Sequence, residues 1–152
     1  MTKVLTFFST LLVAFALTAA SASAKDEIFL KKRWDYALNG YDTVSYHKAS
    51  GPVKGDPQFS TTHKGATWIF ASQENLDAFN ANPAAYRPAY GGYCAWALAT
   101  GKGLQPGDPK AWAVHNGKLY VNLNKGIQKR WLKDKDGFIA KADPLWPSIL
   151  NK

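Results

Sequence analysis

The sequence predicts a small α+β domain of two β-hairpins packed with short helices. Two turn signals carry this prediction, because Lys64-Gly65 and Asn116-Gly117 each separate two runs with the residue types of β-strands. A residue suited to cap a helix follows each hairpin, at Ser72 and at Asn124. Antiparallel hairpins together with separate short helices define the α+β class.

The first 24 residues are typical of a secretory signal peptide. Lys3 gives a basic start, an apolar run extends over residues 4–20, and Ala22-Ser-Ala24 supplies the small residues of a cleavage site. Serine and threonine interrupt the run, which is also shorter than the 18 or more residues of a membrane span. We expect cleavage near Ala24, a periplasmic or secreted protein, and no transmembrane segment in the mature chain. An uncleaved membrane anchor is the alternative.

Residues 25–35 are expected to form a lead-in segment and residues 36–150 a single domain, without an internal repeat. The predicted mature chain has 128 residues, the size of one domain, and its many aromatic residues can fill a compact core. The net charge of the whole chain is +8, and its basic residues stand singly or in small groups. This spacing lacks the long basic run of a nucleic-acid tail, so we expect no nucleic-acid partner.

The first hairpin follows a turn and a predicted strand. Asn39–Asp42 is the turn signal, and Thr43–His47 has the β-branched and aromatic residues of a short strand. Phe59–His63 and Ala66–Phe70 are the two hairpin strands. The face expected to cover the core, with the histidine at its rim, carries Phe59, Thr61, His63, Ala66, Trp68 and Phe70.

Similar signals predict the later elements. A helix begins after Ser72 and ends at Asn82-Pro83, since a residue before proline avoids the helical region. The second hairpin, a helix and a terminal turn or short helix are predicted at Ala111–His115 with Lys118–Leu123, at Asn124–Trp131 and at Asp143–Pro147. The apolar face expected for this hairpin carries Trp112, Val114, Leu119, Val121 and Leu123.

Between the two hairpins lies an aromatic and glycine-rich stretch, Tyr86–Trp96, which holds the only cysteine, Cys94. A short helix is predicted over Tyr93–Thr100, with Gly101 as its C-terminal cap. At the start of this helix the macrodipole would stabilise a thiolate. A lone cysteine in an exported protein forms no internal disulfide. It is therefore structural, a metal or redox ligand, or a nucleophile or intermolecular link.

Several motifs, taken together, resemble the YHS domain family, in an exported single-domain subgroup. The motifs are Asn39–Tyr46, Trp68–Asn75 with Phe79, Asn82-Pro83 with Tyr86, Tyr90–Ala95, Gly117–Tyr120 and Ala142–Pro147. The resemblance covers nearly all of residues 36–149 and implies a small α+β fold related to cysteine-rich metal-binding modules. Ser45, Ala71 and Asn75 stand where the family pattern has cysteines, so the implied thiolate site is absent here.

A replacement metal site can be assembled from Cys94 with His47, His63 and His115, provided that the fold brings them together. Thiolate and imidazole ligands suit copper, as Cu(I) or Cu(II), and also zinc. Copper is favoured, and His47 is the preferred second ligand. The leading interpretation is therefore transition-metal binding in the cell envelope through Cys94.

The alternative is a non-catalytic accessory module that binds a small ligand or an envelope protein without metal. The residues assigned to such a site are Tyr46, Tyr90, Gly91, Gly92 and Tyr93. The tyrosine rings suit a flat ligand, and the two glycines allow it to approach the backbone closely. The sequence lacks cysteine-hydrolase, phosphate-loop and zinc-protease motifs. Enzyme activity is the less favoured interpretation, and no catalytic residue is assigned.

Overall fold

The computed structural model describes residues 25–31, 36–48 and 51–151. Over these residues the chain is α+β, with two separate two-stranded antiparallel sheets and several short helices. The predicted fold class is thus confirmed. The predicted signal peptide and residues 32–35 of the lead-in lie outside the described ranges. Across those ranges, no helix has the length and apolar character needed to cross a membrane.

The first half of the chain holds one hairpin with short helices on either side. Strand β1 (Asp56–His63) pairs with β2 (Ala66–Phe70) across the predicted Lys64-Gly65 turn. The helices are η1 (Ala37–Gly40), η2 (Ser45–His47), α1 (Gln73–Ala81) and α2 (Pro83–Tyr86). The side chain of Ser72 caps α1 as predicted, and Asn82 both follows α1 and caps α2.

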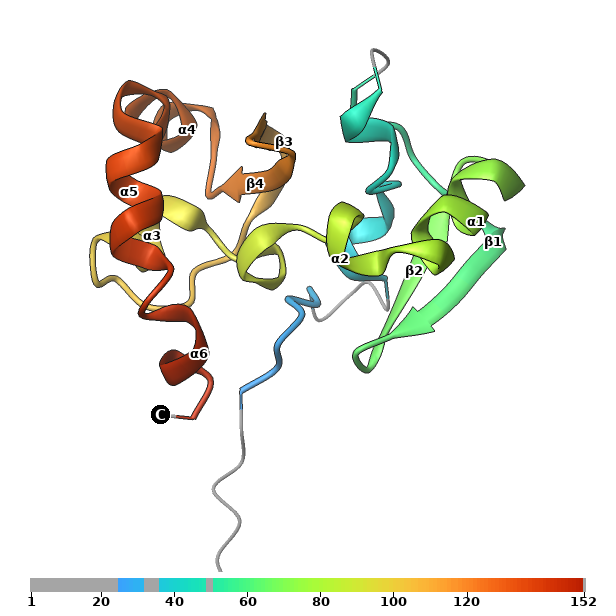
Figure 1. Cartoon of the computed structure of the whole chain (residues 1–152), viewed down its shortest axis with the longest axis horizontal. Coiled ribbons are helices and arrows are strands. Elements are labelled where there is room, and N and C mark those ends of the chain that lie inside the picture. The colour runs from blue at the N-terminus through green and yellow to red at the C-terminus, as the bar shows by residue number, and fades with distance from the viewer. Residues whose placement is uncertain (1–24, 32–35, 49–50, 152) are drawn as a thin grey trace, which may run out of the picture.

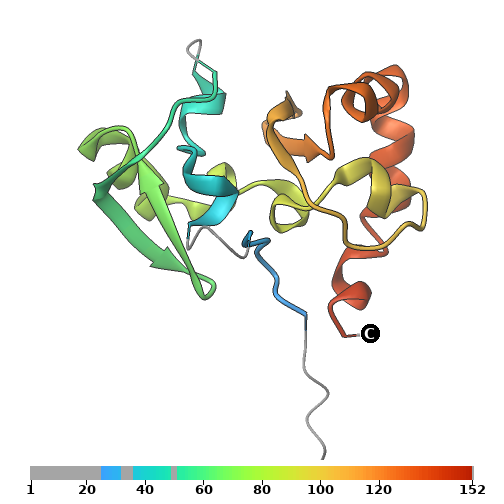
Figure 2. The ribbon, with the colours of Figure 1, turned by 180° about the vertical axis from the view of Figure 1, so that it is seen from behind.

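The second half repeats this order and adds helices at its C-terminal end. Strand β3 (Asp108–His115) pairs with β4 (Lys118–Asn122) across Asn116-Gly117. The helices are η3 (Ala89–Gly92), α3 (Ala95–Ala99), α4 (Lys125–Trp131), η4 (Leu132–Asp134), α5 (Lys135–Ala142) and α6 (Trp146–Ile149). Figures 1 and 2 show the two halves side by side, joined through α2 and η3.

The two halves are two copies of one structural unit, so the expectation that the chain lacks an internal repeat was wrong. Residues 37–86 form the first unit and residues 89–142 the second, and equivalent residues lie 52 positions apart. After a shift of 52 positions, the two hairpins have identical strand bounds and identical strand register. Each also has an irregularity near the start of its first strand. The helix caps Ser72 and Asn82 correspond to Asn124 and Asp134.

Sequence identity between the units is limited to a few positions, among them several glycines. The identical residues in the first unit are Ala37, Gly40, Tyr41, Gly51, Gly55, Asp56, Pro57, His63 and Gly65. Gly40 and Gly65 have positive φ, as do their counterparts Gly92 and Gly117, and glycine adopts this conformation without steric cost. The repeat is therefore clear in the geometry and faint in the sequence.

Each unit has its own apolar cluster, and a third cluster joins the two. Phe79 fills the centre of the first cluster and its counterpart Trp131 the centre of the second, and neither is exposed to solvent. Leu38 and Tyr46 of the first unit pack with Leu119 of β4. Burying one large apolar side chain contributes about 1.5–3 kcal/mol, so these contacts fix the two units against each other.

Strand β4 of the second hairpin is buried on both faces from Leu119 to Asn122, whereas the sequence predicted one apolar face. The third cluster covers Leu119 and Val121, and the helices of the second unit cover Tyr120. Leu123, assigned to the apolar face, is exposed. The helix α5, which provides part of this cover, was not predicted from the sequence.

Thr43–His47 is not a strand, which corrects the sequence-based prediction. Asp42 Oδ1 accepts hydrogen bonds from the backbone N–H groups of Val44 and Ser45, at 2.8 and 3.2 Å. The Ser45 hydroxyl donates to the Asp42 carbonyl at 2.7 Å. These local bonds stabilise a turn and the 3-10 helix η2, and they outweigh the strand preference of the β-branched residues.

Candidate functional site

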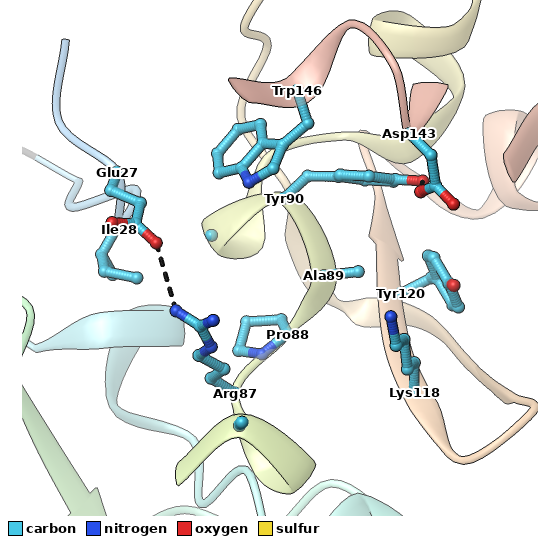
Figure 3. A pocket seen from close by; sticks show the side chains of 12 residues that line it. Glu27, Ile28, Arg87, Pro88, Ala89, Tyr90, Lys118, Tyr120, Asp143 and Trp146 are labelled. Atoms are coloured by element: carbon cyan, nitrogen blue, oxygen red, sulfur yellow. Dashed lines mark hydrogen bonds and ion pairs between the residues drawn. The ribbon is translucent and has the colours of Figure 1, made fainter. Parts of the chain in front are cut away.

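A cavity of about 180 Å³ lies in the second unit, next to its junction with the first. The residues that line it come from the N-terminal segment, α2, η3 with the two residues before it, β4, and the end of the chain after α5. Its charged side chains are Glu27, Arg87, Lys118 and Asp143, and its rings are Tyr90, Tyr120 and Trp146. Figure 3 shows these side chains gathered around Pro88 and Ala89.

A shared carboxylate closes one side of the cavity. Glu27 accepts from Arg87 Nη1 at 3.1 Å, and the Lys64 ammonium lies 2.8 Å from the same carboxylate. All three side chains are about one third exposed, so solvent weakens these pairs to less than about 1 kcal/mol each. Their main effect is therefore to orient Arg87 beside the cavity.

The opposite side is formed by aromatic rings and Asp143. The Tyr90 hydroxyl donates to Asp143 Oδ1 at 2.7 Å, and the Tyr90 ring lies 5.8 Å from Trp146 and 5.9 Å from Tyr120. Burial, together with the hydrogen bond to Asp143, raises the pKa of Tyr90 well above its ordinary value. Tyr90 is therefore a neutral donor at physiological pH and fixes the Asp143 carboxylate at the rim.

The N-terminal segment packs closely against η3. Phe29 N–H donates to the Gly91 carbonyl at 2.9 Å, and the Tyr93 hydroxyl donates to the Asp26 carbonyl at 3.0 Å. A Cβ atom at Gly91 would lie 1.7 Å from the Glu27 carbonyl oxygen, so only glycine permits this approach. The backbone of the N-terminal segment therefore passes close to the chain at Gly91.

Among the predicted ligand-binding residues, Tyr90 and Gly91 line the cavity, whereas Tyr46, Gly92 and Tyr93 are not part of its lining. Tyr46 is buried in the junction between the units, where its hydroxyl donates to the Pro109 carbonyl at 2.9 Å. The Tyr93 ring lies beside Phe29 and Trp146. Two of these tyrosines therefore serve packing between segments.

Cys94 is fully buried at the N-cap position of α3. Its Sγ accepts a hydrogen bond from Leu123 N–H at 3.2 Å, and the thiol lies 3.9 Å from Asn122 Oδ1. Burial raises the pKa of the thiol and outweighs the backbone N–H groups, which act to lower it. This direction is opposite to the one that a helix N-terminus alone would give, and it disfavours a nucleophilic thiolate.

The repeat gives Cys94 a structural counterpart, Asp42, which occupies the same position in the first unit. Asp42 Oδ2 accepts from Ala71 N–H at 2.9 Å, just as Cys94 Sγ accepts from Leu123 N–H, the equivalent amide. Both residues therefore tie the start of a short helix to the end of a hairpin. This shared role explains a lone buried cysteine without metal or chemistry.

The three histidines contact other groups, each in a different place. His47 lies edge-on to Tyr86, and its pKa is lowered by burial. His63 lies edge-on to Phe79 at the rim of the first hairpin, as predicted. His115, its counterpart in the second unit, lies 2.7 Å from Asp136.

The structure does not bring Cys94, His47, His63 and His115 into one group. Over residues 25–31, 36–48 and 51–151, no three side chains among His, Cys, Asp and Glu are close enough to hold one metal ion. The hydrogen-bond partners of Cys94 come from β4 and the residue that follows it. The donor set present around the thiol, an amide group and a backbone N–H, does not fit copper or zinc.

Sequence reasoning missed four of the residues that give the cavity its character: Arg87, Lys118, Asp143 and Trp146. They come from separate elements, and no local spacing connects them. The repeat was detectable, because Gly-Asp-Pro followed by His-x-Gly occurs at residues 55–65 and again at residues 107–117. That signal would have aligned Tyr120 and Lys118 with the buried Trp68 and Ala66.

Comparison with known proteins supports the family through the first unit. No curated protein and no solved structure matches the chain. The family model of the YHS domain matches residues 44–90, which extend from the turn before η2 into η3. The second unit lies almost entirely beyond the matched residues. The match identifies residues 44–90 as a YHS-type segment of this chain.

Proposed function

We propose that this protein is a non-catalytic binding module that holds a small ligand in the cavity of the second unit. The observation that carries the proposal is the lining itself, in which two cations, two carboxylates and three aromatic rings surround one recess. Small-molecule sites combine aromatic walls with a few placed polar groups. Each of these charged groups keeps at least partial access to solvent, so a ligand can reach it.

The site is proposed to work in an exported protein. The basic start, apolar run and small-residue end of residues 1–24 support cleavage near Ala24 and a periplasmic or secreted location. Lys25 N–H, the first backbone group after that point, donates to the Leu150 carbonyl at 2.9 Å. A mature chain that began at Lys25 would keep Glu27 beside the cavity.

The binding proposal is tested by filling the cavity. Ala84 lines the recess and is exposed, so Ala84→Trp should block ligand entry without disturbing the core. We expect a library of small metabolites to contain compounds that raise the melting temperature of the parent protein but not of Ala84→Trp. Ala81→Trp, at an exposed alanine of α1 outside the lining, is the matched control and should respond like the parent. Equal responses in all three proteins, or none in any, would refute the proposal.

Copper binding through Cys94, the interpretation that the sequence favours, stands as the competing proposal. If the cysteine is structural, Cys94→Ser should lower the free energy of unfolding by about 1–2 kcal/mol, because a hydroxyl is costlier to bury than a thiol. The metal content of the purified protein should be the same in both forms. Denaturant unfolding and elemental analysis measure the two effects. Near-stoichiometric copper that disappears in a folded Cys94→Ser protein would instead establish the metal site.

A further inference from the structure

The two units differ at the positions that line the cavity. Ala89, Lys118 and Tyr120 of the second unit correspond to Ala37, Ala66 and Trp68 of the first. In the first unit these three side chains belong to a buried apolar cluster that also contains Ile28 of the N-terminal segment. In the second unit these three residues line the cavity, although Tyr120 is still packed in the apolar cluster of that unit. Lys118 is exposed, so it brings an ammonium group to the position of the buried Ala66.

Opposite charges stand at separate places around this recess. Arg87 shares the Glu27 carboxylate with Lys64, so two cations face one anion on that side. Lys118 and Asp143 take part in none of the ion pairs formed among the described residues. Figure 3 shows Arg87 and Lys118 on either side of Pro88 and Ala89, and Asp143 at the far end of the Tyr90 ring.

A ligand with a single charge satisfies only part of this arrangement. A simple anion between Arg87 and Lys118 would leave Asp143 without a cation, and a simple cation beside Asp143 would leave Lys118 without an anion. Arginine and lysine both bind carboxylates through charge-assisted hydrogen bonds. The ring of Tyr90, whose hydroxyl donates to Asp143, also attracts an ammonium group.

We infer that the cavity binds a small zwitterion of the α-amino acid class. Its carboxylate lies over Pro88 and Ala89 and faces Arg87 and Lys118, and its ammonium group contacts Asp143 and the Tyr90 ring. The volume of about 180 Å³ supports this size, since it is below the roughly 300–1,000 Å³ of sites for drug-sized ligands. The inference rests on the proposed function and names its ligand class.

The test compares matched ligands that differ only in charge. The twenty amino acids are first screened by thermal shift against the full mature protein. The strongest binder is then titrated calorimetrically beside its N-acetyl form, which lacks the ammonium group, and its amide, which lacks the carboxylate. We expect both modified forms to bind at least about tenfold more weakly than the free amino acid, because each loses one charged contact.

Variants assign the two contacts. Lys118→Met should weaken the free amino acid about tenfold and leave the affinity for its amide nearly unchanged. Asp143→Asn keeps an acceptor for the Tyr90 hydroxyl. It should weaken binding of the free amino acid about tenfold and leave the affinity for the N-acetyl form nearly unchanged. Lys129→Met removes an exposed lysine outside the lining and should change neither affinity.

The outcomes separate this inference from the proposed function. If the N-acetyl form or the amide binds as tightly as the amino acid, the site recognises one charge and the inference fails. The inference also fails if no amino acid binds but another metabolite does, and Ala84→Trp abolishes that binding. In that case the proposed function stands. If nothing binds in either screen, both fail.

Discussion

Replacing Asp42 by alanine is expected to lower the free energy of unfolding by about 3 kcal/mol or more, because a buried charged acceptor is removed from four donors. Asp42 Oδ1 accepts from Val44 and Ser45, and Oδ2 accepts from Ala71 N–H at 2.9 Å and from Asn75 Nδ2 at 2.6 Å. These bonds connect η2, the end of β2 and α1. Denaturant unfolding of the parent and of Asp42→Ala measures the difference.

A second aspartate provides the matched control. Asp56 accepts from Gln58 N–H at 3.0 Å at an exposed position, so Asp56→Ala should cost less than about 1 kcal/mol. The stability loss of Asp42→Asn should fall between those of the two alanine variants. The amide keeps one oxygen as an acceptor, but its nitrogen faces N–H donors that a carboxylate oxygen had accepted from. Equal stability losses for Asp42→Ala and Asp56→Ala would contradict the role given to Asp42.

The second large effect is expected at Gly91. A methyl group there would lie 1.7 Å from the Glu27 carbonyl oxygen, and Gly91 has a φ of 62°. Gly91→Ala should therefore release residues 25–30 from η3 and break the Phe29–Gly91 hydrogen bond. Amide hydrogen exchange should show loss of protection at Phe29, and ligand affinity should fall because Glu27 no longer orients Arg87.

The control for this variant is Gly65→Ala. Gly65 has a φ of 73°, but a Cβ atom there would meet nothing within 4 Å. Both substitutions carry the strain of a left-handed conformation, roughly 1–2 kcal/mol, and only Gly91→Ala adds a clash. If Phe29 keeps its protection in Gly91→Ala, or loses it equally in Gly65→Ala, the N-terminal segment is not held by this contact.

Local signals predicted most of the elements. The turns at Lys64-Gly65 and Asn116-Gly117 and the caps at Ser72 and Asn124 act through contacts within a few residues, and all four are confirmed. The prediction of a strand at Thr43–His47 was wrong. Asp42, just before this segment, accepts hydrogen bonds from backbone N–H groups that a strand would use for pairing. Residue preference is a weak guide where a neighbouring side chain supplies a competing partner.

The environment of Cys94 depends on contacts that sequence spacing does not reveal. Its partners, Asn122 and Leu123, lie 28 and 29 positions further along the chain and reach it through β4. The equivalent residue in the first unit is Asp42, so the two units meet the same structural need with different side chains. An identical Gly-Tyr pair precedes each of them, so the sequence can align the two residues, but only the geometry shows that they play the same role.

The cavity could not be predicted as a whole for a similar reason. Tyr90 and Gly91 were assigned from the aromatic and glycine pattern, and they do line it. Arg87, Lys118 and Asp143 reach it from three parts of the chain, and their charges acquire meaning only from their positions around one recess.

Native mass spectrometry of the mature protein, incubated with an amino acid mixture and with one equivalent of copper, tests the central claim most directly. The proposed function and the inferred ligand class predict a one-to-one complex with an organic molecule of amino acid mass, in the parent and in Cys94→Ser alike. Ala84→Trp should lack this complex. One copper ion per chain without an organic ligand, lost in Cys94→Ser, would contradict this account and place the function at the cysteine.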